Sequence, residues 1–261
     1  MQLAAAMRER IKEGHFAMGT FVVELRTPAL ARFLQQAHFD FLLVDNEHGY
    51  WNPLDIAQQI DAGKRWGVCP LVRVSGPDRG EIMRALDAGA EGVMVPMANT
   101  VADVERAVEY SKYPPLGQRG AAFHMAHDGY VGGDVLQKMR SANDEVVLIA
   151  QIENRPGLEN VERIAAIDGI DILWIGQFDL SNFLGIPGQF EHPTFLGALE
   201  RVVTACERHG KTAAFMVPSV DEGLERMRQG FRCIAYWGDL WIYQQGLKQG
   251  VAALKDGAWR K

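Results

Sequence analysis

Cysteine is scarce in this 261-residue chain, which contains three widely separated copies. Cys69, Cys206 and Cys233 form no CxxC pair, and this spacing argues against zinc and dithiol redox motifs. So few cysteines also argue against a disulfide-stabilised framework. We therefore expect all three to be buried side chains that act as small hydrophobic groups.

Long hydrophobic runs are missing too, because no stretch approaches the ~20 consecutive apolar residues that a membrane span needs. The opening MQLAAAMRERIKEG is charged and amphipathic, without a signal-peptide core. A formal charge of -6 gives no basic excess for binding nucleic acid. These absences predict a cytoplasmic protein that binds neither membranes nor nucleic acid, and whose partners are small molecules or other proteins.

Phosphate-binding motifs are absent as well. The chain has neither GxGxxG nor a P-loop, and after the last predicted strand only Gly238 is available to cradle an anion. No lysine stands at the end of a predicted strand, where it could form a Schiff base with a carbonyl substrate. An unphosphorylated substrate and metal-assisted carbonyl chemistry are therefore favoured.

The chain does contain one alternation, repeated along its length, and 48% hydrophobic residues with which to bury a large core. Strand-like apolar runs occur at 17–25, 41–45, 69–74, 92–96, 146–153, 170–176, 212–217 and 233–237. The chain begins with an N-terminal helix. After it, helical periodicity occurs at 27–37, 53–66, 78–88, 101–111, 158–166, 193–209, 220–229 and 240–254. This pattern predicts a (β/α)8 TIM barrel, formed by residues 1–261 as one domain.

A doubly wound open sheet shares this alternation, because alternation alone does not show that a sheet closes. The positions of polar residues favour the barrel, whose active sites are built at the carboxyl ends of its strands. The polar residues at or just past predicted strand ends are Asp45, Arg73, Gln151, Glu153 and Asp179. Residues 113–145 form the one long irregular connection, and such connections usually serve a function or contact a partner.

The stretch VVLIAQIENRPG delivers two polar side chains to one strand end. Gln151 and Glu153 point to the same face, because strand side chains alternate. Glu153 is either paired with Arg73 or a metal ligand. Asp179, just past the sixth predicted strand, is either a helix N-cap or a second acid beside Glu153. Together the two acids and Gln151 suit an oxygen-rich site for Mg²⁺ or Mn²⁺.

The sequence DNEHG follows the second predicted strand. His48 lies three residues after Asp45, which could orient it as a base that titrates near neutral pH; the alternative is a loop histidine without a role. Arg73 ends an apolar strand, so its guanidinium leaves the core at the rim and can face a carboxylate or an enolate oxygen. The alternative for Arg73 is a plain ion pair with Glu47 or Glu153.

Two features of the long connection carry weaker signals. His124 and His127 form an HxxH pair beside Asp128, but without the glutamate and spacing of the zinc protease motif. Surface or subunit contact is the favoured interpretation of this pair. Arg119 is either a solvated surface residue or a loop cation that reaches over the rim.

The assembled motifs resemble the HpcH/HpaI family of class II pyruvate aldolases, within the phosphoenolpyruvate/pyruvate barrel superfamily. The resemblance covers nearly the whole chain. Its motifs are DxEHG at 45–49, PLVRV at 70–74, DAGAxGVMVP at 87–96, PPLGQRG at 114–120, QIE at 151–153 and GxxDLS at 176–181. Two departures lie near the expected acceptor pocket: Gln177-Phe178 replaces the more usual proline and small residue, and Phe21 stands where many members carry tryptophan.

The resemblance implies a metal-dependent aldolase that reversibly cleaves a 4-hydroxy-2-oxo acid to pyruvate, or a hydroxypyruvate-like 2-oxo acid, and an aldehyde. Glu153 and Asp179 would bind the divalent metal, either Mg²⁺ or Mn²⁺, with Co²⁺ and Zn²⁺ as alternatives. Backbone N–H groups around Phe178 and Asp179 would hold the substrate carboxylate. Arg73 would stabilise the enolate, and Gln151 would hydrogen-bond near the metal and the keto oxygen.

On the aldehyde side, the resemblance implies that His48, steered by Asp45, acts through a water on the proton of the aldol hydroxyl. Arg119 would line this side along with Phe21, from the same or a neighbouring subunit. The resemblance further implies a homo-oligomer, trimer or hexamer, in which the C-terminal helix is exchanged between subunits. Two other functions stay open: a related carbon–carbon ligase or decarboxylase on a 2-oxo acid, and a noncatalytic 2-oxo-acid-binding subunit.

Overall fold

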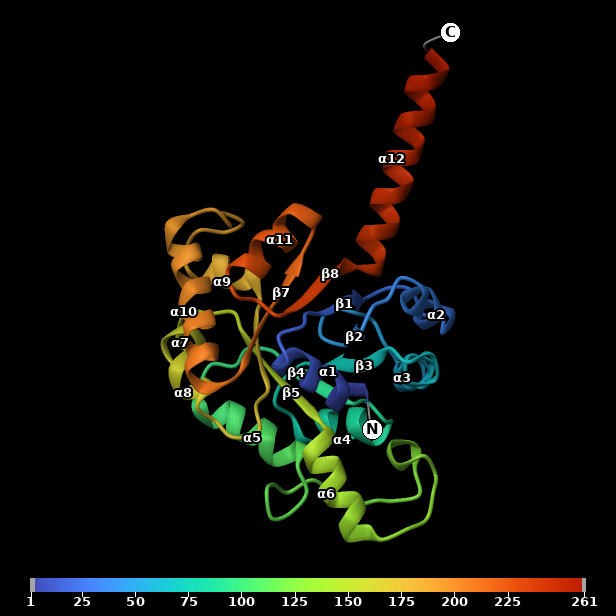
Figure 1. Ribbon diagram of the computed structural model, residues 1–261, viewed down its shortest axis with the longest axis vertical. Coiled ribbons are helices and arrows are strands. Elements are labelled where there is room, and N and C mark those ends of the chain that lie inside the picture. The colour runs from blue at the N-terminus through green and yellow to red at the C-terminus, as the bar shows by residue number, and fades with distance from the viewer. Residues whose placement is uncertain (1–2, 260–261) are drawn as a thin grey trace.

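The computed structural model describes residues 3–259, and its eight strands close into one parallel barrel in which β8 pairs with β1 (Figure 1). The strands are β1 (Ala17–Val22), β2 (Phe41–Asp45), β3 (Cys69–Arg73), β4 (Gly92–Val95), β5 (Val147–Ile152), β6 (Ile172–Ile175), β7 (Thr212–Val217) and β8 (Cys233–Gly238). The predicted (β/α)8 TIM barrel is confirmed. The open-sheet alternative is wrong, because no edge remains between the first and last strands.

Helices surround the barrel and connect each strand to the next. They are α1 (Leu3–Lys12), α2 (Ala29–Gln36), α3 (Pro53–Trp66), α4 (Arg79–Asp87), α5 (Val101–Ser111), α6 (Val135–Glu145), α7 (Arg155–Glu159), α8 (Val161–Ala165), α9 (Gln177–Phe183), α10 (Pro193–His209), α11 (Val220–Arg228) and α12 (Asp239–Trp259). A short 3-10 helix, η1, spans Ala126–Asp128. Among the described helices, none is long and apolar enough to cross a membrane.

The connection 113–145 is more regular than we predicted, because it ends in the helix α6. Asp134 caps this helix by accepting the backbone N–H of Gln137 at 2.8 Å. The apolar positions of α6 are few, so its sequence shows little helical periodicity. Lys112 also holds the helix in place, by donating from its buried ammonium to the backbone carbonyl of Asn143.

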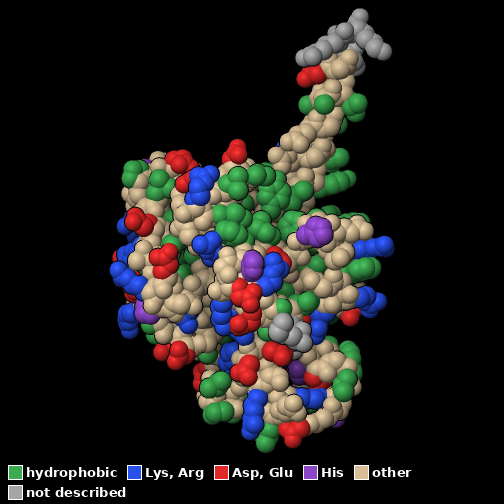
Figure 2. Space-filling view, viewed as in Figure 1, with side chains coloured by type: hydrophobic (Ala, Val, Ile, Leu, Met, Phe, Trp, Pro, Cys, Tyr) green, Lys and Arg blue, Asp and Glu red, His purple; other side chains and the backbone are tan. Residues whose placement is uncertain are grey.

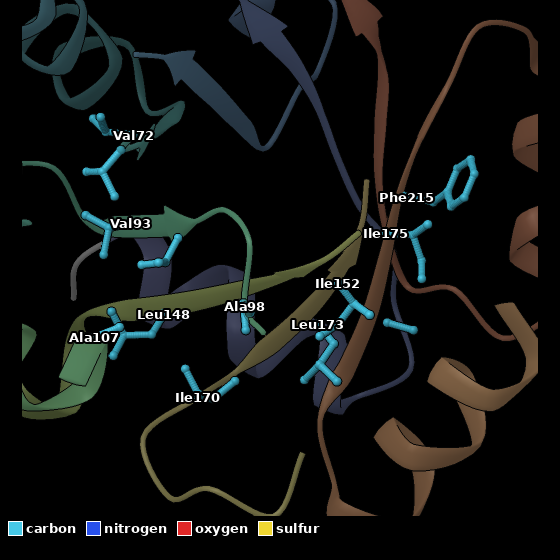
Figure 3. Close-up of a cluster of buried hydrophobic side chains, with 14 of the residues drawn as sticks. Val72, Val93, Ala98, Ala107, Leu148, Ile152, Ile170, Leu173, Ile175 and Phe215 are labelled. Carbon is cyan, nitrogen blue, oxygen red and sulfur yellow. The ribbon is translucent and has the colours of Figure 1, made fainter. Parts of the chain in front are cut away.

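Alternating side chains of the strands build two apolar layers. In β2, Phe41 and Leu43 point into the barrel, whereas Leu42 and Val44 point outwards to the helices. Figure 3 shows part of the outer layer, with labelled residues from β3 to β7 and Ala107 from the helix α5. Of the cysteines, Cys69 and Cys233 lie in the inner layer and Cys206 in the outer one, all buried and free as predicted.

Helix α1 closes the amino-terminal end of the barrel. Its Ala4 and Met7 pack into the inner apolar layer. The buried carboxylate of Glu91 accepts the backbone N–H of Ala4 at 2.7 Å, which satisfies one donor at the start of the helix. With this end sealed, the carboxyl ends of the strands are the face where a ligand can enter.

The last helix, α12, projects away from the barrel (Figure 1) and is fastened at its first residue. The buried carboxylate of Asp239 accepts the backbone N–H groups of Val23, Glu24 and Leu25 at 3.0, 3.1 and 2.6 Å. It also accepts the N–H of Leu240 at 2.7 Å. One side chain therefore connects the start of α12 to the segment that follows β1.

Replacing Asp239 with asparagine should lower the free energy of unfolding by roughly 2–4 kcal/mol, because an amide offers one acceptor where the carboxylate offers two. Urea unfolding followed by circular dichroism measures this change. The control is Asp221→Asn in the first turn of α11, an exposed position where no comparable loss is expected. A change below about 0.5 kcal/mol for Asp239→Asn would contradict the anchoring role.

Candidate active site

Polar side chains gather at the carboxyl ends of β2, β3 and β5. Asp45 and Arg73 are the last residues of β2 and β3, and the parallel register places them opposite one another. Gln151 lies near the end of β5, and Glu153 directly follows that strand. The barrel therefore brings together residues that are more than 100 positions apart in the sequence.

Arg73 is the centre of a buried hydrogen-bond network. Its Nε donates to Asp45 Oδ1 at 3.0 Å and its Nη2 to Asp45 Oδ2 at 2.6 Å, which is a bidentate pair. Its Nη1 donates to Gln151 Oε1 at 3.3 Å and lies 3.1 Å from Glu47 Oε2. The expected pairing with Glu47 is thus found, but the stronger partner is Asp45. A direct ion pair between Arg73 and Glu153 is not formed among the described residues.

Glu153 is 2% exposed and lies at the end of the same network. Its Oε2 accepts a hydrogen bond from Gln151 Nε2 at 2.6 Å, and its Oε1 accepts one from the backbone N–H of Met97 at 2.6 Å. A Cβ atom at Gly176 would stand 2.3 Å from Glu153 Oε2 and 2.6 Å from Gln151 Nε2. Glycine at 176 therefore leaves room at this carboxylate that a side chain would fill.

The carboxylates of the rim disfavour one another's ionised form. Burial raises the pKa of Glu153 to about 7, helped by the nearby charges of Glu47 and Asp179 and opposed by the Met97 N–H and Arg73. Burial likewise raises the pKa of Glu47, whose Oε2 makes no hydrogen bond despite being enclosed. A cation placed among these acids would remove the repulsion.

Asp179 lies in the first turn of α9, half-buried. The N-cap of this helix is Gly176, and no side chain caps it, so the alternative interpretation of Asp179 as an N-cap is wrong. The first N–H groups of a helix have no intrahelical acceptor. Those of α9 include Phe178 and Asp179, at the edge of the same group of residues.

The donor atoms fit a hard divalent cation that keeps positions for substrate. Among the described residues, no three His, Cys, Asp or Glu side chains are arranged to enclose a metal by themselves. Mg²⁺ is typically bound by one or two carboxylates, with other ligands from water or substrate. Each oxygen of Glu153 accepts one hydrogen bond and keeps a second lone pair, and Gly176 leaves space beside it. Glu47 adds a further carboxylate nearby, because its enclosed Oε2 makes no hydrogen bond although it lies 3.1 Å from Arg73 Nη1.

The pKa of Glu153 predicts how the stability of the metal-free protein depends on pH. Between the ordinary value of 4.5 and about 7, the folded state holds a proton that the unfolded state has released. The free energy of unfolding should therefore fall as the pH rises through this window, on the order of 3 kcal/mol in total. Urea unfolding from pH 5 to pH 8 measures the slope. Glu153→Gln should reduce it, and an unchanged slope in that variant would contradict the assignment.

His48 is held differently from our prediction. Its side chain is 63% exposed, and Asp45 Oδ1 accepts its backbone N–H at 3.2 Å. The imidazole does not contact Asp45, because Arg73 occupies the oxygens of that carboxylate; its Nε2 lies 4.0 Å from Glu47 Oε2. Asp45 thus positions the backbone of the turn that carries His48, and Glu47 is the carboxylate nearest the ring.

A cavity of about 350 Å³ opens above these residues. Seven of the predicted site residues line it: Phe21, Asp45, His48, Arg73, Gln151, Phe178 and Asp179. Phe21 packs edge-on against Trp174, with ring centroids 5.6 Å apart, and the guanidinium of Arg73 lies 5.3 Å from the Phe21 ring. Both departures from the family pattern, at 21 and 178, are therefore in the cavity wall.

The family model for HpcH/HpaI aldolase/citrate lyase matches residues 18–239. The chain belongs to this family. It is 28% identical over 255 residues to 2-keto-3-deoxy-L-rhamnonate aldolase from Escherichia coli O9:H4 (strain HS), covering 98% of this chain and 95% of that protein. The predicted family and the predicted enzyme class, an aldolase, are confirmed.

Solved structures agree with this membership. The chain resembles an HpcH/HpaI aldolase from Desulfitobacterium hafniense DCB-2 with a TM-score of 0.91 and 30% identity, over 95% of this chain and 96% of that one. It also resembles the citrate synthase SbnG with a TM-score of 0.88 and 26% identity, over 98% and 99% of the two chains. The shared fold thus serves more than one reaction, and the substrate depends on the residues around the cavity.

One residue predicted for the site lies elsewhere in this HpcH/HpaI family member. Arg119 is buried beside the long connection, where its Nη2 pairs with Asp87 Oδ1 at 2.8 Å and its guanidinium lies 4.7 Å from the Tyr113 ring. It does not line the cavity of its own chain. Within the described residues, His124 and His127 belong to no group of three or more His, Cys, Asp or Glu side chains that could hold a metal.

The sequence did not predict several residues that line the cavity of this family member. Met216, Trp241 and Val23 line it, although we did not assign them to the site. The sequence indicated Glu47 only as an ion-pair partner for Arg73, yet Glu47 lies close enough to Glu153 to raise the pKa of Glu153. Apolar residues near strand ends look like ordinary core in a sequence, so no sequence signal separated them from it.

Proposed function

We propose that this chain is a metal-dependent aldolase that reversibly cleaves a 4-hydroxy-2-oxo acid into an aldehyde and pyruvate, or a hydroxypyruvate-like 2-oxo acid. The observation that carries the proposal is the continuous hydrogen-bonded series from Asp45 through Arg73 and Gln151 to Glu153, beside the cavity. This series combines a fixed cation, Arg73, with a buried carboxylate, Glu153, that makes no direct ion pair with it among the described residues. Family membership and the names of the curated relatives support the same reaction class.

Glu153 and Asp179 are the residues that would hold a divalent cation, Mg²⁺ or Mn²⁺, with Co²⁺ and Zn²⁺ as alternatives. When bound, such a cation would act as a Lewis acid that withdraws electron density from the keto group. Gln151 is directed by its bonds to both Arg73 and Glu153, so it can donate or accept only in a fixed orientation. The N–H groups of Phe178 and Asp179 suit the substrate carboxylate, because they carry the positive end of α9.

In cleavage, His48 acts through a water to remove the proton from the C4 hydroxyl. The C3–C4 bond breaks, the carbonyl of the aldehyde forms at C4, and the electron pair becomes the enolate of pyruvate. Arg73 stabilises the negative oxygen of this enolate, and proton transfer to C3 completes the product. The exposed imidazole of His48 and the buried guanidinium of Arg73 line one cavity, which supports these roles.

Pyruvate release from a 4-hydroxy-2-oxo acid, measured with a coupled lactate dehydrogenase assay, tests the proposal. Treatment with a chelator followed by desalting should abolish the activity, and added Mg²⁺ or Mn²⁺ should restore it. Activity that persists after thorough metal removal would contradict the metal-dependent mechanism.

The likeness to the citrate synthase SbnG supports a second candidate, a carbon–carbon ligase acting on a related oxo acid. Both reactions would use the same stabilisation of an enolate. Chromatographic and mass-spectrometric analysis of products separates them, because an aldolase releases an aldehyde whereas the ligase does not. Exclusive formation of a hydroxylated tricarboxylic acid from a 2-oxo diacid and an acetyl thioester, with water and release of the free thiol, would favour the ligase.

The last helix supports assembly into a homo-oligomer, trimer or hexamer, with α12 exchanged between subunits. Its exposed apolar residues repeat at helical spacing along one side: Tyr243, Leu247, Val251 and Leu254. Figure 2 shows hydrophobic side chains gathered near the start of this projecting helix. Sedimentation equilibrium measures the mass in solution, and a stable monomer at micromolar concentration would exclude the exchange.

A further inference from the structure

The cavity has two chemically different walls. The polar wall comes from the ends of β2, β3 and β5, which supply Asp45, Arg73 and Gln151. The opposite wall is formed by three residues. Met216 lies in β7, Trp241 lies in the first turn of α12 after β8, and Val23 directly follows β1. Because β7, β8 and β1 are consecutive neighbours in the closed barrel, this second wall is continuous and apolar.

The aromatic parts of the apolar wall are held in fixed positions. Trp241 stacks on Trp237 with ring centroids 6.4 Å apart and an interplanar angle of 17°. A Cβ atom at Gly238 would stand 2.7 Å from the Trp241 ring, so the indole lies directly over the backbone there. Phe178, at the rim of the wall, packs edge-on against Phe190 with centroids 5.3 Å apart. Because these aromatic side chains are already held in place, they bind an apolar group without the entropic cost of ordering the side chains.

The apolar wall offers no charge for an acidic substrate tail. Within the described part of the chain, Arg73 is the one lysine or arginine that lines the cavity, and Asp45 and Gln151 already engage it. Gln177 turns its amide away, because its Nε2 donates to the backbone carbonyl of Met216 at 3.0 Å. A carboxylate brought against this wall would lose hydration and find no partner.

We propose that the aldehyde side of the reaction takes an uncharged aldehyde with an apolar tail, either branched aliphatic or aromatic. The inference rests on the proposed aldolase function, in which the 2-oxo acid occupies the polar wall. The acceptor carbon must approach the enolate near Arg73, so the rest of the aldehyde extends towards Val23, Met216 and Trp241. These three residues determine specificity and take no part in the bond-making step.

A matched pair of aldehydes tests the inference in the condensation direction with pyruvate. 4-Methylpentanal and 4-oxobutanoate have the same number of heavy atoms and differ in ending in an isopropyl group or a carboxylate. We expect kcat/KM to be on the order of 100-fold higher for 4-methylpentanal. The wall makes apolar contacts with the isopropyl group, whereas the carboxylate of 4-oxobutanoate finds no partner there. Equal values, or a preference for 4-oxobutanoate, would overturn the inference.

A charge placed in the wall should invert the selectivity. Met216→Lys supplies a cation, so the ratio of kcat/KM for 4-methylpentanal over 4-oxobutanoate should fall at least about 10-fold. Met216→Leu, which conserves volume and polarity, is the matched control and should keep the preference. If Met216→Lys does not fold, Val23→Lys places the charge just past the end of β1, on the same wall. A ratio that stays the same in a folded lysine variant would contradict the assignment of the wall.

Exchange of the pyruvate methyl protons for deuterium separates this inference from the proposed function. The exchange, followed by NMR in D2O with Mn²⁺ or Mg²⁺ present, requires enolate formation but no aldehyde. Exchange accompanied by a preference for the acidic aldehyde overturns the inference and leaves the aldolase assignment intact. Absence of both exchange and cleavage overturns the proposed function itself. Exchange with a preference for 4-methylpentanal supports both.

Discussion

Replacing Glu153 with alanine should lower pyruvate release by about 10³-fold or more and abolish tight binding of Mn²⁺. The side chain is buried, lies beside the room left by Gly176, and carries a charge that its surroundings disfavour. Isothermal titration with Mn²⁺ and the coupled assay measure the two effects. Circular dichroism should show an intact barrel, since the variant removes a buried charge and not a packed apolar group. Tight Mn²⁺ binding retained by this variant would move the metal site elsewhere.

The matched control is Glu91→Ala. Glu91 is also a buried glutamate whose pKa is raised by burial, but it accepts the N–H of Ala4 at the closed end of the barrel. Its loss should cost stability and leave Mn²⁺ binding and pyruvate release within about two-fold of the wild type. An equal loss of metal binding in both variants would show that the effect of Glu153→Ala is structural.

Replacing Arg73 with lysine should lower kcat on the order of 100-fold while changing stability little. Lysine keeps one positive charge beside Asp45, which avoids an unpaired buried carboxylate, but it loses the rigid fork that reaches both Asp45 and Gln151. A single lost donor to a developing oxyanion typically costs two to three orders of magnitude. Steady-state kinetics and urea unfolding measure the two quantities.

Arg226→Lys is the control for Arg73→Lys. Arg226 is likewise buried, pairs with Glu222 at 3.1 Å and lies 4.9 Å from the ring of Phe215, but it belongs to α11 on the outside of the barrel. Its kcat should stay within about two-fold of the wild type. If Arg73→Lys also keeps its kcat, the guanidinium serves the fold and not the enolate.

The fold could be predicted in detail because its signals are local. A strand buried on both faces needs an uninterrupted apolar run, and an amphipathic helix needs an apolar stripe, so the alternation of the two is visible in sequence. The sequence did not predict α6 because this helix has few apolar positions, and because contacts such as that between Lys112 and Asn143 join residues far apart in the chain. Closure was inferred only from the positions of polar residues, and β8 pairing with β1 confirms it.

For the site, the sequence identified which polar residues reach the rim, since a charged side chain at the end of an apolar strand has no other place to go. It did not determine which of them pair. For Arg73 the sequence indicated two acids, Glu47 and Glu153. The register of β2 with β3 instead places Asp45 opposite Arg73 as its bidentate partner, which leaves His48 without the expected contact. Arg119 shows the same limit, because its pairing with Asp87 joins two segments that no local pattern connects.

The sequence by itself therefore determined the barrel, the family and the polar residues at the carboxyl ends of the strands, because each depends on patterns within a few neighbouring positions. Only the tertiary structure decided the pairing of Arg73, the neighbourhood that raises the pKa of Glu153, and the apolar wall of Val23, Met216 and Trp241. The physical reason is that pairing, burial and cavity shape are properties of residues far apart in the chain. They exist once β1 and β8 meet and the barrel closes.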